Sequence, residues 1–273
     1  MSTQLKSAVD AAQAAGKIHR RYYGKALRIE MKKDNNLNLV TQVDKACEKK
    51  IQAILHQRTP GFNFWGEESG RGSGDSQYTW LVDPLDGTTN FAHAYPFFCV
   101  SIALIQGKEP VLGVVYDAMN NECFTAEKGQ GARLNGKRIR VSAESKLSKS
   151  LLATGFAYGV KETLYNFENF KNFVLNSQGV RRDGSAAMNM AYVAAGRFEG
   201  FWERGIQAWD MAAAVCLIRE AGGQVTDISG KPYDLLAQNA LASNGKIHSQ
   251  MRKLLWAGPD EKRWVARYKK SLR

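Results

Sequence analysis

The residues with the clearest chemical potential are two aspartates on either side of a proline and a leucine, in Asp83-Pro84-Leu85-Asp86. They follow the apolar segment Tyr78–Val82, which is typical of a buried strand. Pro84 restricts Asp83 to extended conformations, so the two carboxylates and the Leu85 carbonyl can converge on one point. Mg²⁺ binds hard oxygen ligands of this kind, although the same residue types are also common in simple turns.

Two further segments place a carboxylate at the end of an apolar element. Glu67 follows the apolar segment Phe62–Trp65, and Asp210 opens an apolar helical pattern. Taken alone, Glu67 is also explained as part of a solvated acidic loop, and Asp210 as an ordinary helix N-cap. Together with Asp83 and Asp86, they lie beside the ends of buried elements, where α/β folds bind ligands. Four carboxylates in one cleft repel one another unless divalent cations lie between them, as in hydrolases with two metals about 3.5–4 Å apart.

Helical and strand patterns are arranged differently in the two halves of the chain. In the first half, two helical patterns precede a series of short strands separated by Gly, Pro, Asn and Asp. From about residue 145 strands alternate with helices, which favours an α/β unit. We therefore expect an α+β half at residues 1–145 with most of the carboxylates, and an α/β half at residues 146–273 with Asp210. Helices are expected within residues 1–28, 44–59, 162–175, 185–195 and 210–221, and strands at 62–65, 78–82, 97–105, 111–116, 122–126, 138–141, 151–154, 180–182, 198–202 and 224–227.

Composition indicates an ordinary folded protein. The chain has 273 residues, of which 44% are hydrophobic and 23% charged, and no stretch of roughly 18 consecutive apolar residues. No secretion signal opens the sequence, so we expect a cytoplasmic protein that crosses no membrane. Four scattered cysteines and four histidines without a metal-binding spacing leave carboxylates as the ligands for any metal.

The net charge of +12 is concentrated at one end of the chain. Residues Arg252–Arg273 contain eight basic and two acidic side chains, so this tail contributes +6. A basic tail of this kind is either a solvated helix end or a surface that binds nucleic acid or an acidic partner.

Three motifs in this order resemble the signatures of the inositol monophosphatase family. They are Gly66-Glu67-Glu68, the segment Asp83–Phe91 and Trp209-Asp210, and residues 181–187 resemble the bacterial inositol-1-monophosphatases most. The resemblance covers the chain from the first helix to about residue 245. It implies a layered α-β-α-β-α sandwich, the fold type of inositol monophosphatase and fructose-1,6-bisphosphatase.

The resemblance also implies the roles of individual residues. Glu67, Asp83 and the Leu85 carbonyl would hold one Mg²⁺; Asp83, Asp86 and Asp210 would hold a second; a third, weaker ion would bind near Glu67 through waters. Thr88, backed by Asp44, would orient the attacking water together with Glu67. The substrate contacts implied in this way are Asp86, Gly87, Thr88, Gly184, Ser185, Ala186, Glu203 and Asp210.

The function implied is a Mg²⁺-dependent phosphatase of small polyol or sugar monophosphates, with inositol 1-phosphate as the first substrate to test. The reaction would use metal-activated water and form no phosphoenzyme, because Thr88 and Glu67 supply orientation and no nucleophile. Alternative substrates are fructose 1,6-bisphosphate, histidinol phosphate and 3′-phosphoadenosine 5′-phosphate. A different class remains open as well, namely a regulatory protein that contacts RNA or RNA polymerase through its basic surface. The family resemblance further implies a homodimer and inhibition by lithium.

Overall fold

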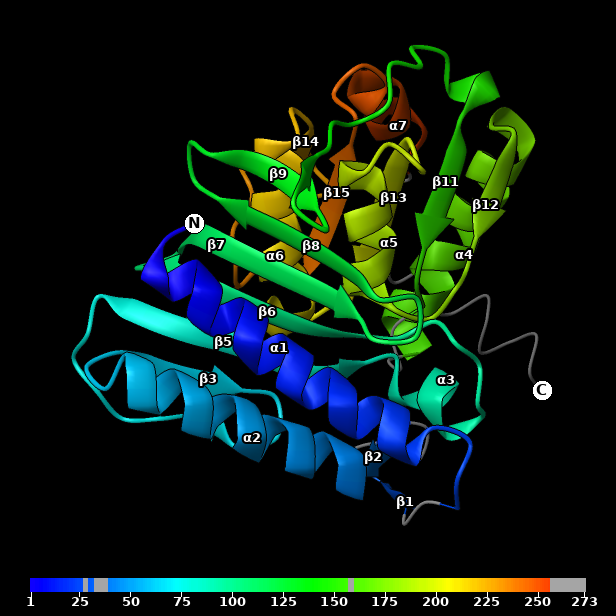
Figure 1. Cartoon of the computed structure of the whole chain (residues 1–273). Helices are drawn as coiled ribbons and strands as arrows, with labels where there is room; N and C mark the ends of the chain where they lie inside the picture. The colour runs from blue at the N-terminus through cyan, green and yellow to red at the C-terminus, as the bar shows by residue number, and fades with distance from the viewer. Residues whose placement is uncertain (27–28, 32–38, 157–159, 256–273) are drawn as a thin grey trace.

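The structure is a computed structural model that describes residues 1–26, 29–31, 39–156 and 160–255. Within these residues the helices and sheets form five stacked layers (Figure 1). The helical layers are α1 (Thr3–Tyr22) with α2 (Gln42–Arg58) on one face of the large sheet, α5 (Ala186–Ala194) with α6 (Ala208–Glu220) between the two sheets, and α4 (Val160–Asn176) with α7 (His248–Leu254) on the outer face of the small sheet. The expected α-β-α-β-α sandwich is therefore confirmed.

In the described part of the chain the large sheet has the strand order β10-β9-β8-β7-β6-β5-β3-β4, and all its pairs are antiparallel except β3 with β5. Its strands are β3 (Asn63–Gly66), β4 (Gly70–Arg71), β5 (Tyr78–Asp86), β6 (Cys99–Gln106), β7 (Glu109–Asp117), β8 (Glu122–Glu127), β9 (Gly131–Leu134) and β10 (Lys137–Arg138).

The small sheet is mixed, with the order β12-β11-β13-β15-β14 in the residues that the structure describes. Its strands are β11 (Leu151–Thr154), β12 (Gly179–Arg181), β13 (Gly200–Arg204), β14 (Gln224–Thr226) and β15 (Asn239–Ser243). Outside the two sheets lie the hairpin β1 (Ile29–Met31) with β2 (Leu39–Thr41), the short helix α3 (Thr88–Ala92) and the 3-10 turn η1 (Leu147–Lys149).

In the described residues, each helical layer packs on its sheet or sheets through one hydrophobic core. The largest core joins α5 and α6 to both sheets, a second joins α1 and α2 to the large sheet, and a third joins α4 and α7 to the small sheet. Helix α6 is rich in alanine, and it approaches β7 so closely that a Cβ on Gly113 would lie 2.2 Å from the Ala213 carbonyl oxygen. Small side chains therefore let the central helix lie directly on the sheet.

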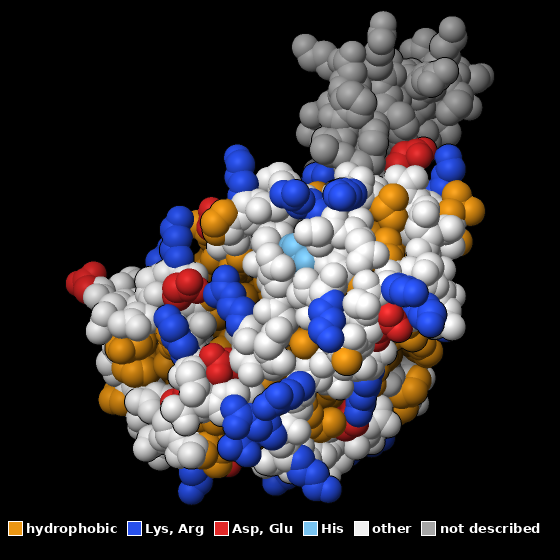
Figure 2. Space-filling view, turned by 90° about the horizontal axis from the view of Figure 1, so that it is seen from above, with side chains coloured by type: hydrophobic (Ala, Val, Ile, Leu, Met, Phe, Trp, Pro, Cys, Tyr) orange, Lys and Arg blue, Asp and Glu red, His pale blue; other side chains and the backbone are white. Residues whose placement is uncertain are grey.

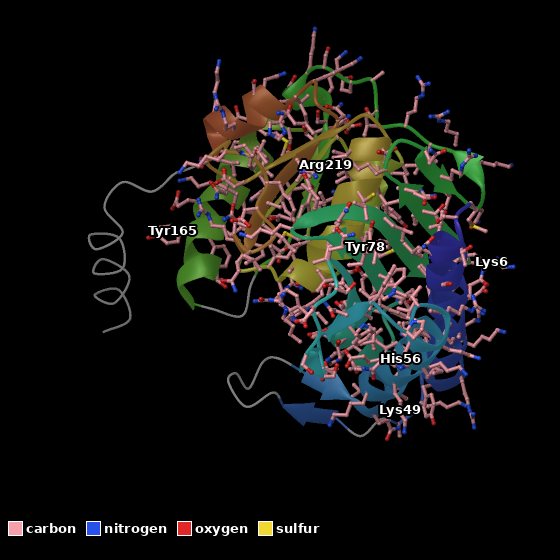
Figure 3. The ribbon with its side chains drawn as sticks, turned by 90° about the vertical axis from the view of Figure 1, so that its left-hand side faces the viewer. Lys6, Lys49, His56, Tyr78, Tyr165 and Arg219 are labelled. Atoms are coloured by element: carbon pink, nitrogen blue, oxygen red, sulfur yellow. The ribbon has the colours of Figure 1, made fainter. Side chains whose placement is uncertain are left out.

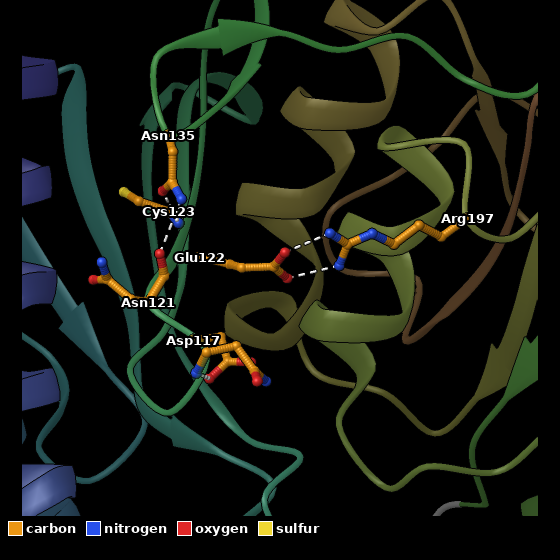
Figure 4. Close-up of polar contacts among 7 residues, drawn as sticks. Asp117, Asn121, Glu122, Cys123, Asn135 and Arg197 are labelled. Atoms are coloured by element: carbon orange, nitrogen blue, oxygen red, sulfur yellow. Dashed lines mark hydrogen bonds and ion pairs between the residues drawn. The ribbon is translucent and has the colours of Figure 1, made fainter.

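The two predicted halves meet in this central core and at its rim. The expected boundary near residue 145 falls between β10 and β11, the last strand of the large sheet and the first of the small one. At the rim, Glu122 of β8 forms a bidentate ion pair with Arg197, just after α5 (Figure 4). Because one core contains residues from both sides of the boundary, the division at residue 145 stays a prediction about folding units.

Helix α2 begins one turn earlier than its sequence suggests. Thr41 is the N-cap, and its hydroxyl accepts a hydrogen bond from the Val43 N–H at 3.0 Å. Asp44, expected as the N-cap, is instead the N3 residue of a capping box and accepts from the Thr41 N–H at 2.8 Å. This correction matters because an N3 side chain has one carboxylate oxygen for the cap and a second that is available elsewhere.

No helix in the described ranges has both the length and the apolar composition needed to cross a membrane.

Candidate active site

One pocket between the two halves collects the residues expected to do chemistry. Its volume is about 190 Å³. The predicted residues that line it are Glu67, Asp83, Leu85, Asp86, Gly87, Thr88, Gly184, Ser185, Ala186, Glu203 and Asp210. Asp44 lies behind Thr88 and completes the predicted set.

A bulge in β5 turns its two aspartates into this pocket. The strand does not stop at Val82, since it continues to Asp86, and its register against β6 shifts between Asp83 and Asp86. The Asp83 carboxylate accepts a hydrogen bond from the Leu85 N–H at 2.9 Å. Under the bulge, the Pro84 carbonyl oxygen lies 3.0 Å from Nε2 of the buried His19. Burial lowers the pKa of His19 to about 4, so the ring is neutral and donates to this carbonyl.

Three carboxylates from distant parts of the chain meet in the pocket. Asp83, Asp86 and Asp210 each place a carboxylate oxygen within 4.8 Å of the other two. Burial raises the pKa of Asp83 and of Asp210, and charge repulsion within the group and from Glu67 raises both further. Such a set of oxygen ligands is stable in the ionised form when a divalent cation neutralises it, so the residues fit a metal site.

Asp210 reaches the group from the first turn of α6. The helix is capped at Gln207, whose N–H donates to Asp210 at 3.0 Å, so Asp210 is the N3 residue of a capping box and not the N-cap. A capping box therefore holds Asp210 at the start of α6, as another holds Asp44 at the start of α2. One oxygen of Asp210 accepts from the Gln207 N–H, and the other is available to the site.

Asp86 is held by the N-terminus of α5, which comes from the other half of the chain. One oxygen of Asp86 accepts from the Ser185 hydroxyl at 2.6 Å and from the Ala187 N–H at 2.7 Å. These bonds, with one from the Ala186 N–H, lower the pKa of Asp86 against the larger upward effect of burial. The Ser185 hydroxyl is thus committed to a predicted metal ligand.

Thr88 and Asp44 form a second hydrogen-bonded unit beside the carboxylates. The Thr88 hydroxyl is 2.9 Å from Asp44 Oδ1 and 3.0 Å from the Leu85 carbonyl oxygen. Burial raises the pKa of Asp44 to about 6, although the Thr41 and Thr88 hydrogen bonds act in the opposite direction. Gly87 precedes Thr88 with a φ of 98°, a left-handed conformation that favours glycine.

The opposite end of the pocket contains Glu203 and Asn189. Burial, followed by the charge of Asp86, raises the pKa of Glu203 to about 8, and the nearby Arg182 opposes this shift. The carboxylate lies against Gly155, where a Cβ would come within 2.2 Å of it. Within the described residues the Glu203 carboxylate makes no hydrogen bond, and neither does the fully buried carboxamide of Asn189.

Sequence reasoning missed Asn189, His19 and a buried glutamate of α2, Glu48. Glu48 is 4% exposed, although it precedes two lysines and resembles a solvated residue in the sequence. The helical spacing could have predicted its burial, because Glu48 shares the inward face of α2 with Asp44 and Ile51.

The comparisons with known proteins agree with this geometry. The model of the inositol monophosphatase family matches residues 1–259. The inositol-1-monophosphatase of Synechocystis sp. is 44% identical over 270 residues, covering 98% of this chain and 93% of that protein. The Nus factor SuhB of Escherichia coli is 42% identical over 254 residues, covering 92% and 95%. A solved inositol monophosphatase from Anabaena (Nostoc) sp. has a TM-score of 0.84 at 44% identity, covering 93% of this chain and 96% of that one.

The chain belongs to the inositol monophosphatase family. It is accordingly a phosphoric monoester hydrolase, a phosphatase whose acidic pocket is able to bind metal.

Proposed function

We propose that this phosphatase uses Mg²⁺ to hydrolyse monoesters of small polyols, with inositol 1-phosphate as its preferred substrate. The observation that carries the proposal is the convergence of Asp83, Asp86 and Asp210 within 4.8 Å, in a chain whose relatives include the inositol-1-monophosphatase of Synechocystis sp.. The ligand atoms that meet there within the described residues are carboxylate oxygens, which matches the preference of Mg²⁺.

The pocket residues divide into two sets of metal ligands. Glu67, Asp83 and the Leu85 carbonyl would hold one Mg²⁺, and Asp83, Asp86 and Asp210 would hold another, with a third ion near Glu67. Divalent cations at these positions lower the pKa of a water molecule and neutralise charge on the phosphate and leaving oxygen. Asp83 belongs to both sets, so its removal should affect the reaction most.

The protein's own contribution to the attack is orientation. When the Thr88 hydroxyl donates to Asp44, the Thr88 oxygen keeps its lone pairs for a proton of the attacking water. Glu67 lines the same pocket and would orient this water together with Thr88. Because Thr88 and Glu67 supply orientation and no nucleophile, and the buried Ser185 oxygen caps α5 by accepting from the Met188 N–H, we propose direct attack by water without a phosphoenzyme.

The substrate would lie along the pocket with its phosphate at the carboxylate end. Backbone N–H groups of Gly87 and Thr88, at the start of α3, would meet the phosphate oxygens. The alcohol would extend toward Gly184, Ser185, Ala186 and Glu203. Because the Ser185 side chain and the Ala186 N–H are bonded to Asp86, we assign the hydroxyl contacts mainly to Glu203.

Phosphate release from a panel of monoesters tests the substrate and the metal together. The panel contains inositol 1-phosphate, fructose 1,6-bisphosphate, histidinol phosphate and 3′-phosphoadenosine 5′-phosphate, each with Mg²⁺ and with EDTA. We expect the highest kcat/KM for inositol 1-phosphate and no turnover in EDTA. Equal turnover in Mg²⁺ and in EDTA would refute the metal requirement. A higher kcat/KM for another ester would make that ester the preferred substrate in place of inositol 1-phosphate.

A second candidate role, in contacts with RNA or RNA polymerase, is favoured by the 42% identity to the Nus factor SuhB of Escherichia coli. Lys and Arg side chains are spread over the face shown in Figure 2. Most of the basic segment Arg252–Arg273 lies outside the described residues. Salt-sensitive binding of RNA or polymerase would support this role, and binding that does not change between low and high salt would oppose it. A homodimer and inhibition by lithium stay predictions.

A further inference from the structure

Helix α2 contains a buried carboxylate that the proposed reaction does not use. Glu48 is 4% exposed, whereas the next residue, Lys49, is exposed and lies on the outer side of α2 with His56 (Figure 3). A buried carboxylate is expensive unless it is hydrogen-bonded, so its partners explain its position.

The partners of Glu48 are two backbone N–H groups in the loop after β3. One oxygen accepts from the Glu68 N–H at 2.9 Å, and the other accepts from the Ser69 N–H at 2.8 Å. On the other side of this turn, the Glu67 N–H donates to the Val82 carbonyl of β5 at 3.0 Å. The turn at residues 67–69 is thus bonded at Glu67 to the strand that carries the aspartates, and at the next two residues to the Glu48 side chain of α2.

The contact also explains the glycine that precedes Glu67. A Cβ on Gly66 would lie 2.3 Å from a carboxylate oxygen of Glu48, so any other residue would displace that carboxylate. Helix α2 and the loop therefore approach each other at Gly66, and the carboxylate fills the space between them.

We propose that Glu48 is a positioning residue that sets the direction of Glu67 toward the metal end of the pocket. The inference rests on the proposed function, in which Glu67 binds Mg²⁺. Two N–H donors that point at two different oxygens require a carboxylate, because an amide side chain accepts at only one of its two terminal atoms. Hydrogen-bonded supports of metal ligands commonly change metal affinity by about 10–100-fold when they are removed.

A second glutamate supplies a matched control for a purely structural role. Glu220 of α6 accepts from the Gly129 N–H at 2.8 Å and from the Gly131 N–H at 2.7 Å, so it holds a loop in the same way. None of these three residues lines the pocket. Any effect that comes only from loosening a loop should therefore appear equally in Glu48→Gln and Glu220→Gln.

The experiment measures Mg²⁺ binding by calorimetry on the full chain without substrate, together with thermal unfolding. We expect Glu48→Gln to weaken Mg²⁺ binding by about 10–100-fold and Glu220→Gln to leave it unchanged. Glu48→Asp keeps the negative charge but is one methylene too short for both donors, so it should weaken binding similarly. Activity at saturating Mg²⁺ should recover in both Glu48 variants, as expected for a change in metal affinity.

Gly66→Ala keeps the test decisive if Glu48 substitutions fold poorly, and a double variant tests the route of the effect where they fold. Gly66→Ala keeps Glu48 but displaces its carboxylate, and it should also weaken Mg²⁺ binding. Combining Glu48→Gln with Glu67→Gln should weaken binding no more than Glu67→Gln alone, because both act through one ligand.

The proposal is overturned if folded Glu48 variants bind Mg²⁺ like the wild type, or if Glu48→Asp does so while Glu48→Gln does not, which would indicate a charge effect only. Failure of the proposed function is a separate result. It would appear as a wild-type protein that binds no Mg²⁺ or an Asp83→Asn variant that remains fully active.

Discussion

The two ends of the pocket differ in how much the protein supports its own polar groups. At the carboxylate end, Asp83 is bonded to the Leu85 N–H and Asp210 to the Gln207 N–H. At the alcohol end, the buried Glu203 carboxylate has no hydrogen-bond partner among the described residues. The carboxylate end is therefore preorganised by the protein's own hydrogen bonds, whereas the alcohol end has polar groups that a ligand would satisfy.

This difference indicates where chemistry and specificity reside. Metal ligands must be held in one arrangement for every substrate, because the phosphate group is the same in each. Under the proposed function, unsatisfied groups such as Glu203 should distinguish substrates by their alcohols, because a ligand without the right hydroxyl leaves a buried polar group unpaired. Substitutions at each end of the pocket test this division.

Asp83→Asn should have the largest effect. Removing the charge shared by both proposed metal sites should reduce kcat for every substrate by roughly a thousandfold or more, equivalent to about 4 kcal/mol of barrier. The asparagine can still accept from the Leu85 N–H, so circular dichroism should show an unchanged fold. Retention of a tenth of the activity would refute the assignment of the carboxylate end.

Thr88→Ala should come second, with a loss of about a hundredfold in kcat at saturating Mg²⁺, since orientation and proton transfer are removed while the metal ligands remain. Asp44→Asn should lose less than Asp83→Asn, because it acts only through Thr88. Steady-state kinetics of the three variants gives the order, and an Asp44 variant as inactive as Asp83→Asn would contradict it.

Glu203→Gln should change substrate preference more than general activity. We expect kcat/KM for inositol 1-phosphate to fall about tenfold, in the range of one weakened hydrogen bond. Hydrolysis of 4-nitrophenyl phosphate, whose alcohol has no ring hydroxyls, should barely change. An equal loss of kcat/KM for both esters would show that Glu203 acts on the reaction itself and not on substrate choice, which would contradict the proposed division between the two ends.

The smallest effect concerns stability and the support under the β5 bulge. His19 has a pKa lowered from 6.5 to about 4, so protonation favours the unfolded chain. The stabilisation from the neutral ring is complete above pH 6.5 and is lost progressively as the pH falls toward 4. At pH 5.5 the free energy of unfolding is lower by roughly 1 kcal/mol than at neutral pH because of this group.

His19→Gln checks this pH dependence, because glutamine can donate to the Pro84 carbonyl and does not titrate in this range. Urea unfolding at pH 7.5 and 5.5 should show a smaller loss of stability in the variant. Identical losses in both proteins would show that His19 does not titrate as its burial requires.

Most of the large elements could be predicted from local patterns, and the failures have physical causes. Strand β11 was expected at its observed residues, and the core strands β5 to β8 were found with shifted ends. Strand β15 was missed, since Asn239–Ser243 is poor in β-branched and aromatic residues and owes its conformation to pairing with β13 and β14 on both sides.

The starts of α2 and α6 were misplaced for a related reason. Both Asp44 and Asp210 are good N-cap residues, so local preference selects them, but Thr41 and Gln207 are the caps. In each capping box one oxygen of the aspartate accepts from the N-cap N–H. The other oxygen of Asp44 accepts from the Thr88 hydroxyl, whereas Asp210 itself lines the pocket.

The spacing of Asp83 and Asp86 and the residue types around Glu67 and Asp210 are local properties, so the sequence alone predicts which carboxylates gather in the pocket. Which groups hold these carboxylates depends on the packing of the fold. Ser185 bonds to Asp86 across 99 residues of chain, and Glu48 reaches the Glu67 loop from a different helix. Such contacts depend on how layers pack, and packing brings together residues whose separation along the chain contains no information about their distance in space.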